Sequence, residues 1–214
     1  MRSKLLVTAI LLSLGSNAQE QCTSHGITMR HLAAKGLGTD LRSALRQLPK
    51  GTPKGGGVTV IPVVVHVVWN TPAENVPDAA ILAMVDGMNA DYSASNSDIV
   101  NVRPAFTPVV TDTDIQFCLA SVDPNGDPTT GITRTQTTET WFDPDTETDD
   151  MKSPPKGISP WDPDHYLNIW ICDITSGAVG GAITVGYAYL PVPGIPGSSI
   201  DGLVVDQEYG IDPL

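Results

Sequence analysis

The apolar positions of the chain form several short β-rich runs and one helical pattern. The first run, residues 58–69 (VTVIPVVVHVVW), is almost continuously apolar and β-branched, which predicts a strand covered on both faces. Shorter runs at residues 114–121, 165–172, 185–191 and 201–206 predict four more strands. Together they predict an α/β fold built on a twisted sheet of five strands.

The amphipathic helical pattern lies in residues 76–93. One helical face collects the large apolar residues of this segment: Ile81, Met84, Val85, Met88 and Tyr92. Pro77 suits the first helical position, and Asp78 suits the positive end of the helix dipole. Because this helix lies between two strands, we expect a crossover that leaves those strands parallel. No amphipathic helix follows residue 94, so one sheet face is expected to lack a covering layer.

Residues 1–18 have the pattern of a secretory signal. Arg2 and Lys4 give a basic start, residues 5–14 are almost wholly apolar, and Ala18 is a small residue suited to cleavage. The apolar run is too short to span a bilayer as a helix. We therefore expect a secreted, extracellular protein with no membrane association after signal removal; a retained anchor is the alternative.

Residues 19–57 differ from the rest of the chain in composition. Leucines at roughly helical spacing predict weak helical structure: Leu32, Leu37, Leu41, Leu45 and Leu48. Gly36 and Gly38 interrupt this pattern, and a link rich in proline and glycine follows at residues 49–57. We expect residues 19–57 to be a separable leader and residues 58–214 to be the body.

The charge of the chain is unevenly distributed. The leader carries six bases and two acids, a net charge of +4, whereas the body carries four bases and 22 acids, a net charge of −18. So acidic a body repels nucleic acid and anionic lipid, which excludes both as expected partners. A basic leader can instead dock on the acidic body of the same chain.

The chain has three cysteines, and export permits disulfides. Cys118 and Cys172 both lie in strand-like segments of the body, whereas Cys22 lies in the leader. We therefore predict a disulfide between Cys118 and Cys172, with Cys22 left unpaired.

The motifs of common hydrolases and metal sites are absent from the sequence. None of the four histidines forms a His-x-x-x-His pair, and no Gly-x-Ser-x-Gly elbow, phosphate loop or Cys-x-x-Cys occurs. His66 lies within VVVHVV and is expected to be buried and bonded to a neighbour. His165 follows Asp162 and Asp164 and is expected to be solvated.

Two acidic segments raise the question of calcium. Asp123, Asn125 and Asp127 alternate as in an EF-hand loop, but Pro128 occupies the sixth position, where such a loop needs glycine. A β-turn is therefore expected there. The segment 143–150 (DPDTETDD) could hold calcium through its carboxylates, although a solvated acidic loop is the default expectation.

Taken in order, several segments look like successive blocks of one family: IPVVVHVVWN, NADYSASNSD, DTDIQFCLASVDPNGDPTTGITRT, WDPDHYLNIWIC, GYAYLP and DGLVVD. The family is the cytophagalysin branch of the pappalysin family, secreted zinc metallopeptidases of the metzincin clan. The resemblance covers roughly residues 58–206. It implies a metzincin-like upper lobe: a mostly parallel mixed sheet with one antiparallel edge strand and one long crossover helix, above a zinc cleft.

The chain departs from this family after DGLVVD. The extended HExxHxxGxxH motif, which carries the three zinc ligands and the glutamate base of the family, is absent. The resemblance therefore implies an upper lobe truncated before the zinc-binding helix. The zinc ligands and catalytic residues are expected beyond residue 214, and this chain is expected to be inactive.

The resemblance also implies roles for two parts of the chain. Gly186, Tyr187, Ala188 and Tyr189 correspond to the edge strand that pairs with an extended protein or peptide substrate; an ordinary sheet strand is the alternative. Cys22 lies where latent relatives carry a cysteine that caps the zinc; a stray or intermolecular cysteine is the alternative.

The expected function is that of a secreted zinc metalloendopeptidase, a hydrolase made as a zymogen, of which this chain holds the signal, pro-segment and upper lobe. The alternative is a complete, non-catalytic secreted module derived from a peptidase, which holds a peptide or calcium.

Overall fold

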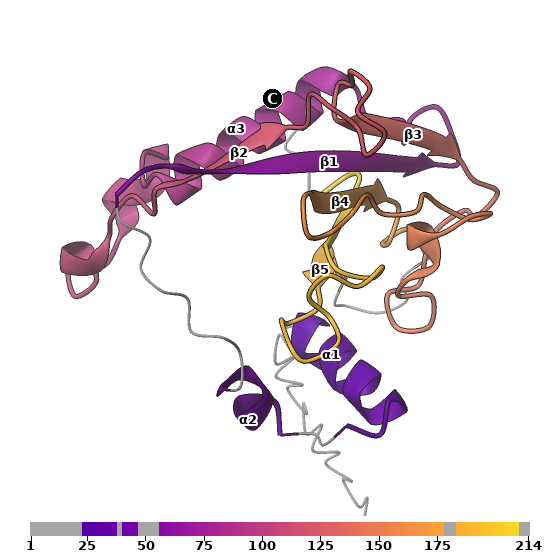
Figure 1. Ribbon diagram of the computed structural model, residues 1–214, viewed down its shortest axis with the longest axis horizontal. Helices are drawn as coiled ribbons and strands as arrows, with labels where there is room; N and C mark the ends of the chain where they lie inside the picture. Colours follow the sequence, from indigo (N-terminus) through magenta and orange to yellow (C-terminus); the bar gives the residue numbers. More distant parts are fainter. Residues whose placement is uncertain (1–22, 38–39, 47–55, 178–182, 210–214) are drawn as a thin grey trace, which may run out of the picture.

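The computed structural model describes residues 23–37, 40–46, 56–177 and 183–209 (Figure 1). The signal and Cys22 lie outside these residues. The α-helices are α1 (Thr23–Ala34), α2 (Leu41–Arg46) and α3 (Asp78–Tyr92). Short 3-10 helices are η1 (Ser97–Asn101), η2 (Thr107–Val109) and η3 (Asp150–Lys152). The strands are β1 (Thr59–Trp69), β2 (Ile115–Leu119), β3 (Ile132–Gln136), β4 (Leu167–Cys172), β5 (Gly186–Ala188) and β6 (Leu203–Asp206).

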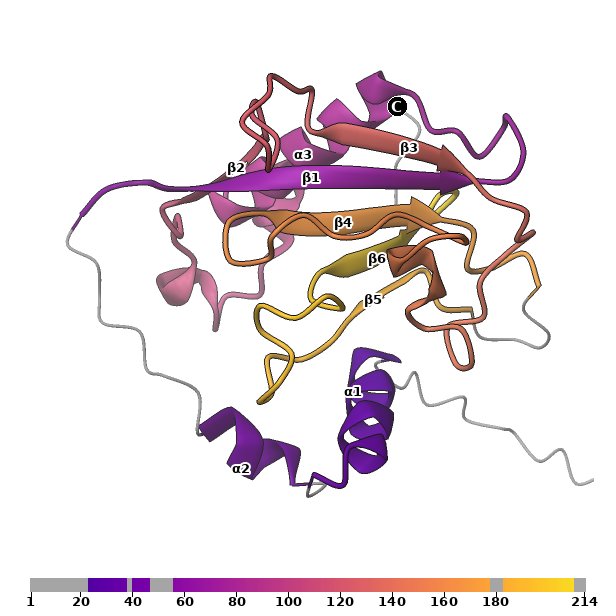
Figure 2. The same ribbon diagram turned by 45° about the vertical axis from the view of Figure 1, so that its right-hand side comes forward.

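The strands form one mixed sheet in the order β2-β1-β4-β6-β5, with β3 also paired to β1 (Figure 2). β1 is long enough to pair with β2 along its first half and with β3 along its second half, on the same side. Every pair is parallel except β5 with β6. The predicted mostly parallel sheet with one antiparallel edge strand is confirmed.

The sequence missed β3, so the described sheet has six strands instead of five. The segment ITRTQ is short and largely polar, and it is paired to the strongly apolar second half of β1. Gly131, just before β3, has a φ of +71°, and a Cβ there would lie 2.7 Å from the backbone nitrogen of Ala120. A glycine therefore lets the chain pass close to β2 as it enters β3.

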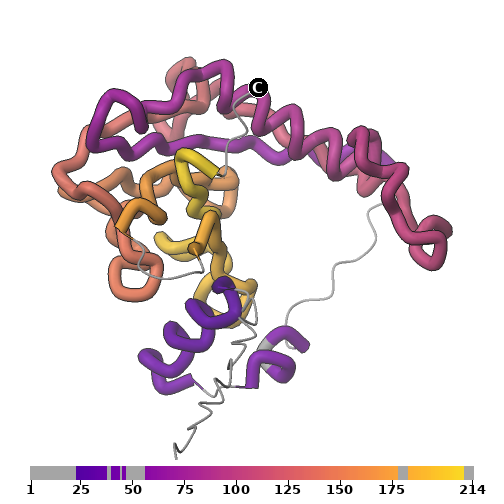
Figure 3. The backbone as a smooth tube through the Cα atoms, turned by 180° about the vertical axis from the view of Figure 1, so that it is seen from behind, coloured from indigo at the N-terminus to yellow at the C-terminus, as the bar shows by residue number. Residues whose placement is uncertain are grey.

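One face of the sheet is covered by α3 (Figure 3). Ile81 and Val85 are buried against the alternate residues of β1 and β4 that face this helix. The Asn89 side chain donates to the Phe117 carbonyl at 2.9 Å and accepts from the Phe117 amide at 2.7 Å, which ties α3 to β2. The predicted helix is confirmed, although Pro77 is its N-cap rather than its first helical residue.

The opposite face also has a cover, which the sequence did not predict. Phe142 and Met151, from the long segment between β3 and β4, are buried against Trp170 of β4 and Val204 of β6. This second layer has no amphipathic period because it consists mostly of turns. The expectation of a bare sheet face is therefore wrong for this part of the sheet.

The leader helix α1 packs beside β5 (Figure 2). It ends at Ala34, and Gly36, whose φ is +65°, turns the chain just after it; the amides of Gly36 and Leu37 donate to the carbonyls of Ala33 and Leu32. This is a Schellman motif, so a glycine ends the helix where the leucine pattern alone would continue. No helix in the described part of the chain is long and apolar enough to cross a membrane.

Candidate functional site

β5 is the edge strand of the described sheet, next to β6, so one side of its backbone points away from the sheet (Figure 2). The Asp206 amide donates to the Val185 carbonyl at 2.9 Å, and Tyr187 is paired with Val204. Hydrogen-bonded and non-bonded pairs alternate in an antiparallel ladder. The backbone groups of Tyr187 therefore face β6, whereas those of Gly186 and Ala188 face outward.

The tyrosines of this edge are anchored on the segment that covers the sheet. The Tyr187 hydroxyl donates to the Thr148 carbonyl at 2.7 Å, and the Tyr189 hydroxyl donates to the Asp149 carboxylate at 2.7 Å. Burial raises the pKa of Tyr187, and burial together with the Asp149 contact raises the pKa of Tyr189. Both therefore stay protonated at neutral pH and act as hydrogen-bond donors.

A buried lysine supports the same edge. Lys152 is 3% exposed, and its Nζ donates to the Ile200 carbonyl at 2.8 Å and lies 3.0 Å from Asp149 Oδ1. The Nζ also lies over the rings of Trp170 and Tyr189, at 5.3 and 5.0 Å from their centroids. Burial lowers the pKa of Lys152, and Asp149 opposes that change. Two ring faces and one carboxylate thus stabilise the ammonium behind the edge.

The outward amides of the edge are occupied by the leader helix. The Ala188 amide donates to Ser24 Oγ at 3.2 Å, and the Leu190 amide donates to Thr28 Oγ1 at 3.0 Å. No sequence pattern predicted these contacts, because Ser24 and Thr28 belong neither to the leucine pattern of the leader nor to a motif.

The two body histidines lie as predicted. His66 is fully buried, with Nε2 at 3.0 Å from Asn168 Oδ1 and Nδ1 at 2.6 Å from Thr133 Oγ1. The Asn168 oxygen can only accept, so Nε2 carries the proton and Nδ1 accepts from the Thr133 hydroxyl. Burial lowers the pKa of His66 to about 4, so the ring is neutral. His165 is exposed and pairs with Asp162 at 2.9 Å.

The described residues do not fit a catalytic zinc site. They contain no group of three or more histidine, cysteine, aspartate or glutamate side chains that could hold a metal ion. His66 bonds to Thr133 and Asn168, which uses both of its ring nitrogens.

A lysine lies among the carboxylates of the acidic loop that could hold calcium. Lys156 Nζ lies 2.8 Å from Asp150, 3.1 Å from Glu147 and 3.5 Å from Glu139. The hydrogen bonds to Asp150 and Glu147 raise the pKa of Lys156. The ammonium therefore takes the place that a calcium ion would need among these carboxylates.

The other acidic segment, residues 123–127, forms the expected turn. Asp123 Oδ1 accepts the backbone amides of Asn125 and Asp127, each at 2.9 Å. These hydrogen bonds lower the pKa of Asp123. Its carboxylate thus stabilises its own turn by accepting backbone hydrogen bonds.

The predicted disulfide is wrong in this structure. Cys118 and Cys172 are both free thiols, the first exposed and the second buried. Cys118 is opposite Pro62 of β1, and β1 lies between β2 and β4. Two strand spacings, about 10 Å, exceed the ~7 Å that a disulfide spans between Cα atoms. Burial raises the pKa of Cys172, which keeps that thiol protonated.

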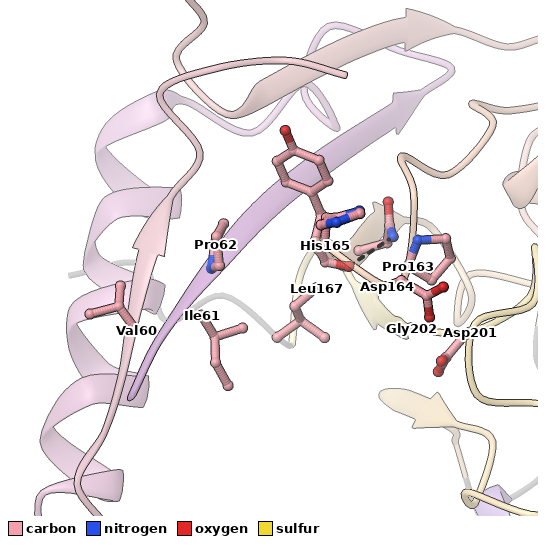
Figure 4. A pocket seen from close by; sticks show the side chains of 11 residues that line it. Val60, Ile61, Pro62, Pro163, Asp164, His165, Leu167, Asp201 and Gly202 are labelled. Carbon is pink, nitrogen blue, oxygen red and sulfur yellow. Dashed lines mark hydrogen bonds between the residues drawn. The ribbon is translucent and has the colours of Figure 1, made fainter. Parts of the chain in front are cut away.

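A cavity of about 320 Å³ lies at the amino ends of the parallel strands (Figure 4). Ile61 and Leu167 contribute apolar walls, and Asp164, His165 and Asp201 contribute polar groups. No residue of the β5 edge lines this cavity. The cavity and the predicted substrate strand are therefore separate features.

No family model and no curated protein matches the chain. Several solved structures do match it. Mature mirolysin from Tannerella forsythia, in complex with a cleaved peptide, is 36% identical over 72% of this chain and 54% of its own, with a TM-score of 0.61. A variant of Tannerella forsythia promirolysin is 32% identical over 85% of this chain and 58% of its own, with a TM-score of 0.69. Mirolysin in complex with a compound is 34% identical over 71% and 54%, with a TM-score of 0.61.

These neighbours support a relationship to the metallopeptidase family, since mirolysin is a metzincin-type metallopeptidase. The mostly parallel sheet with one antiparallel pair is consistent with a metzincin-like fold. The chain spans a little over half of the length of the mirolysin chains that it matches.

Proposed function

We propose that this chain contains the signal, the pro-segment and the upper lobe of a secreted zinc metalloendopeptidase of the cytophagalysin branch. Its domains are the signal (1–18), the pro-segment (19–57) and the upper lobe (58–214). The zinc supplies an activated water to such a reaction, and its ligands are proposed to lie beyond residue 214. The described residues are proposed to contribute peptide binding, and they contain no group of three or more histidine, cysteine, aspartate or glutamate side chains that could hold a metal ion.

The observation that carries this proposal is the outward backbone of β5. An extended peptide can add to a sheet edge through main-chain hydrogen bonds, and Gly186 and Ala188 present such groups. The hydroxyls of Tyr187 and Tyr189 anchor the strand on the body, and these side-chain bonds do not use the outward backbone groups that a peptide would pair with. The mirolysin structure that matches this chain contains a cleaved peptide.

The assignment of residues 19–57 as a pro-segment draws on two observations. α1 packs on the β5 edge, and the promirolysin match covers 85% of this chain whereas the mature mirolysin match covers 72%. Within this proposal, Cys22 is the residue that caps the zinc in the latent enzyme, and an unpaired thiol of intermolecular use is the alternative.

Two measurements test the proposed function. The coding DNA beyond the codon for Leu214 should encode the HExxH motif shortly after DGLVVD. The product of the whole reading frame should hydrolyse a quenched peptide and lose that activity in 1,10-phenanthroline. A downstream reading frame without this motif contradicts the proposal.

The alternative function is a non-catalytic secreted module that binds peptide. It draws on one observation, the outward backbone of β5, which can bind a peptide without a metal ion. Such a module should melt in one sharp, cooperative transition as the 214-residue chain. An HExxH motif encoded after Leu214 would contradict this alternative.

A further inference from the structure

We propose that α1 closes the β5 edge through a hydroxyl lock: Ser24 and Thr28 occupy the outward amides that a bound peptide would use. The lock involves neither a metal ion nor Cys22. It rests on the proposed peptide-binding role of β5, and it adds a regulation that acts on the same backbone atoms.

The spacing of the two elements explains how a helix can serve a strand edge. Outward amides two residues apart on a strand are separated by about 6.7 Å. Side chains four residues apart on a helix lie on one face and are separated by about 6 Å along the axis. Ser24 and Thr28 are four residues apart, and Ala188 and Leu190 are two residues apart. The two hydroxyls therefore meet the two amides, at 3.2 and 3.0 Å.

The Thr28 hydroxyl is oriented for this contact. It donates its own proton to the Ser24 carbonyl at 2.7 Å, one turn back along α1. Its oxygen lone pairs are then left to accept the Leu190 amide. Thr28 is fully buried, so both the hydroxyl and the amide are satisfied within the protein.

Apolar contacts between α1 and the body position the two hydroxyls at the β5 edge. Ile27 lies three residues after Ser24 and Leu32 lies four residues after Thr28, so the two apolar side chains flank the hydroxyl positions on α1, and both are almost fully buried. Ile27 packs in the cluster that contains Tyr187, and Leu32 packs on Val192 and Ile195 after the strand. The helix thus presents apolar and hydroxyl side chains together, on the stripe that faces β5.

Charge contributes less to this docking than the composition predicted. Arg30 pairs with Asp145 at 2.9 Å, but the side chains are 49% and 71% exposed. Such exposed pairs are weak because water and salt screen them. No other ion pair joins leader bases to body acids in the part of the chain that the structure describes.

The lock and a bound peptide exclude each other. A peptide strand added to β5 must place its carbonyl oxygens at the Ala188 and Leu190 amides, where the two hydroxyls now lie. The Thr23 and Thr184 hydroxyls, 3.2 Å apart, continue the contact towards the start of the strand. The edge therefore opens only when α1 moves away.

Amide hydrogen exchange on the full chain tests the contact itself. In the native protein, we expect the Ala188 and Leu190 amides to exchange at least ten-fold more slowly than an unstructured chain. In the double variant Ser24→Ala, Thr28→Val, these two amides should exchange at least ten-fold faster than in the native protein, whereas the Tyr187 amide, which faces β6, should keep its protection. Exchange at Ala188 and Leu190 close to the unstructured rate in the native chain overturns the lock, and so does an unchanged rate in the variant.

Two matched variants separate the lock from a general loss of packing. Thr28→Ser keeps the hydroxyl, so the Leu190 amide should keep most of the protection that it has in the native protein. Thr23→Val removes a hydroxyl from the same helix but from neither outward amide, so Ala188 and Leu190 should stay protected. Equal deprotection in the Thr23→Val and double variants would overturn the lock.

A dye-labelled Val-Thr-Val-Thr-Val peptide tests the competition. It should bind the double variant at least ten-fold more tightly than the native chain. Equal binding to both overturns the regulatory role of the lock. Deprotected amides without peptide binding to either protein would leave the contact established and overturn the proposed peptide-binding function.

Discussion

His66 Nε2 and Asn168 Oδ1 lie 3.0 Å apart and join the two central strands, β1 and β4. The same Asn168 oxygen also accepts the Trp161 amide at 2.8 Å, and the Asn168 side-chain nitrogen donates to the Trp161 carbonyl at 3.0 Å. One buried imidazole therefore connects the middle of the sheet to the segment that enters β4.

This histidine predicts a loss of stability in acid. The pKa of His66 is about 4 in the folded protein and about 6.5 in an unfolded chain, so the unfolded state binds more protons between these values. The free energy of unfolding should fall by up to about 3 kcal/mol as the pH falls from 6.5 to 4. Urea titrations of the native protein and His66→Gln should differ in slope over this range. Parallel pH profiles would contradict the prediction.

Gly131 and Gly126 form a matched pair for a backbone test. Both have positive φ, but a Cβ on Gly131 would meet the Ala120 backbone at 2.7 Å whereas a Cβ on Gly126 would meet nothing within 4 Å. Gly126→Ala should cost about 1 kcal/mol of stability through strain alone. Gly131→Ala should cost about 2 kcal/mol or more, because the close approach adds to the strain. Urea unfolding gives both values, and equal costs would disprove the close approach.

The free thiols predict the pattern of chemical labelling. Cys118 should react with a thiol reagent in the folded protein, whereas Cys172 should react only after unfolding, since it is buried and its thiol stays protonated. Mass spectrometry of labelled peptides distinguishes the two sites. A disulfide-linked 118–172 peptide under non-reducing conditions would contradict the strand order described here.

Lys156 predicts how the acidic loop responds to calcium. Millimolar calcium should leave the Tm of the native protein unchanged, because the ammonium already lies among Glu139, Glu147 and Asp150. Lys156→Gln should lower the Tm by a few degrees and make it sensitive to calcium, since three carboxylates are then left without a cation. Asp123→Asn, in the other acidic turn, is the control and should create no calcium sensitivity. A calcium-dependent Tm in the native protein would refute the explanation.

The sequence predicted the elements whose residues repeat strongly. β1 is almost continuously apolar and α3 has one apolar face, so both were found close to their observed bounds. β3 was missed because ITRTQ has little apolar content of its own, and its strand conformation depends on pairing with β1. The cover over the second sheet face was missed because Phe142 and Met151 lie in turns without a period.

The candidate site was predictable only as a strand. GYAYLP predicted a strand near the end of the chain, and the resemblance placed it at an edge. The occupation of its amides by Ser24 and Thr28 depends on a tertiary match between a helix and a strand, which no local pattern encodes. The disulfide prediction failed for a similar reason, since the order of the strands decides which cysteines can meet.

β1 is bordered on one side by β2 and β3, and on the other by β4, which comes much later in the chain. While the chain leaves the ribosome, the side of β1 that pairs with β4 stays bare, because a parallel pair needs its second strand. A bare, β-branched strand adheres readily to other copies of itself. Nascent chains that stall between β3 and β4 should therefore self-associate, whereas chains that extend past Cys172 should stay monomeric.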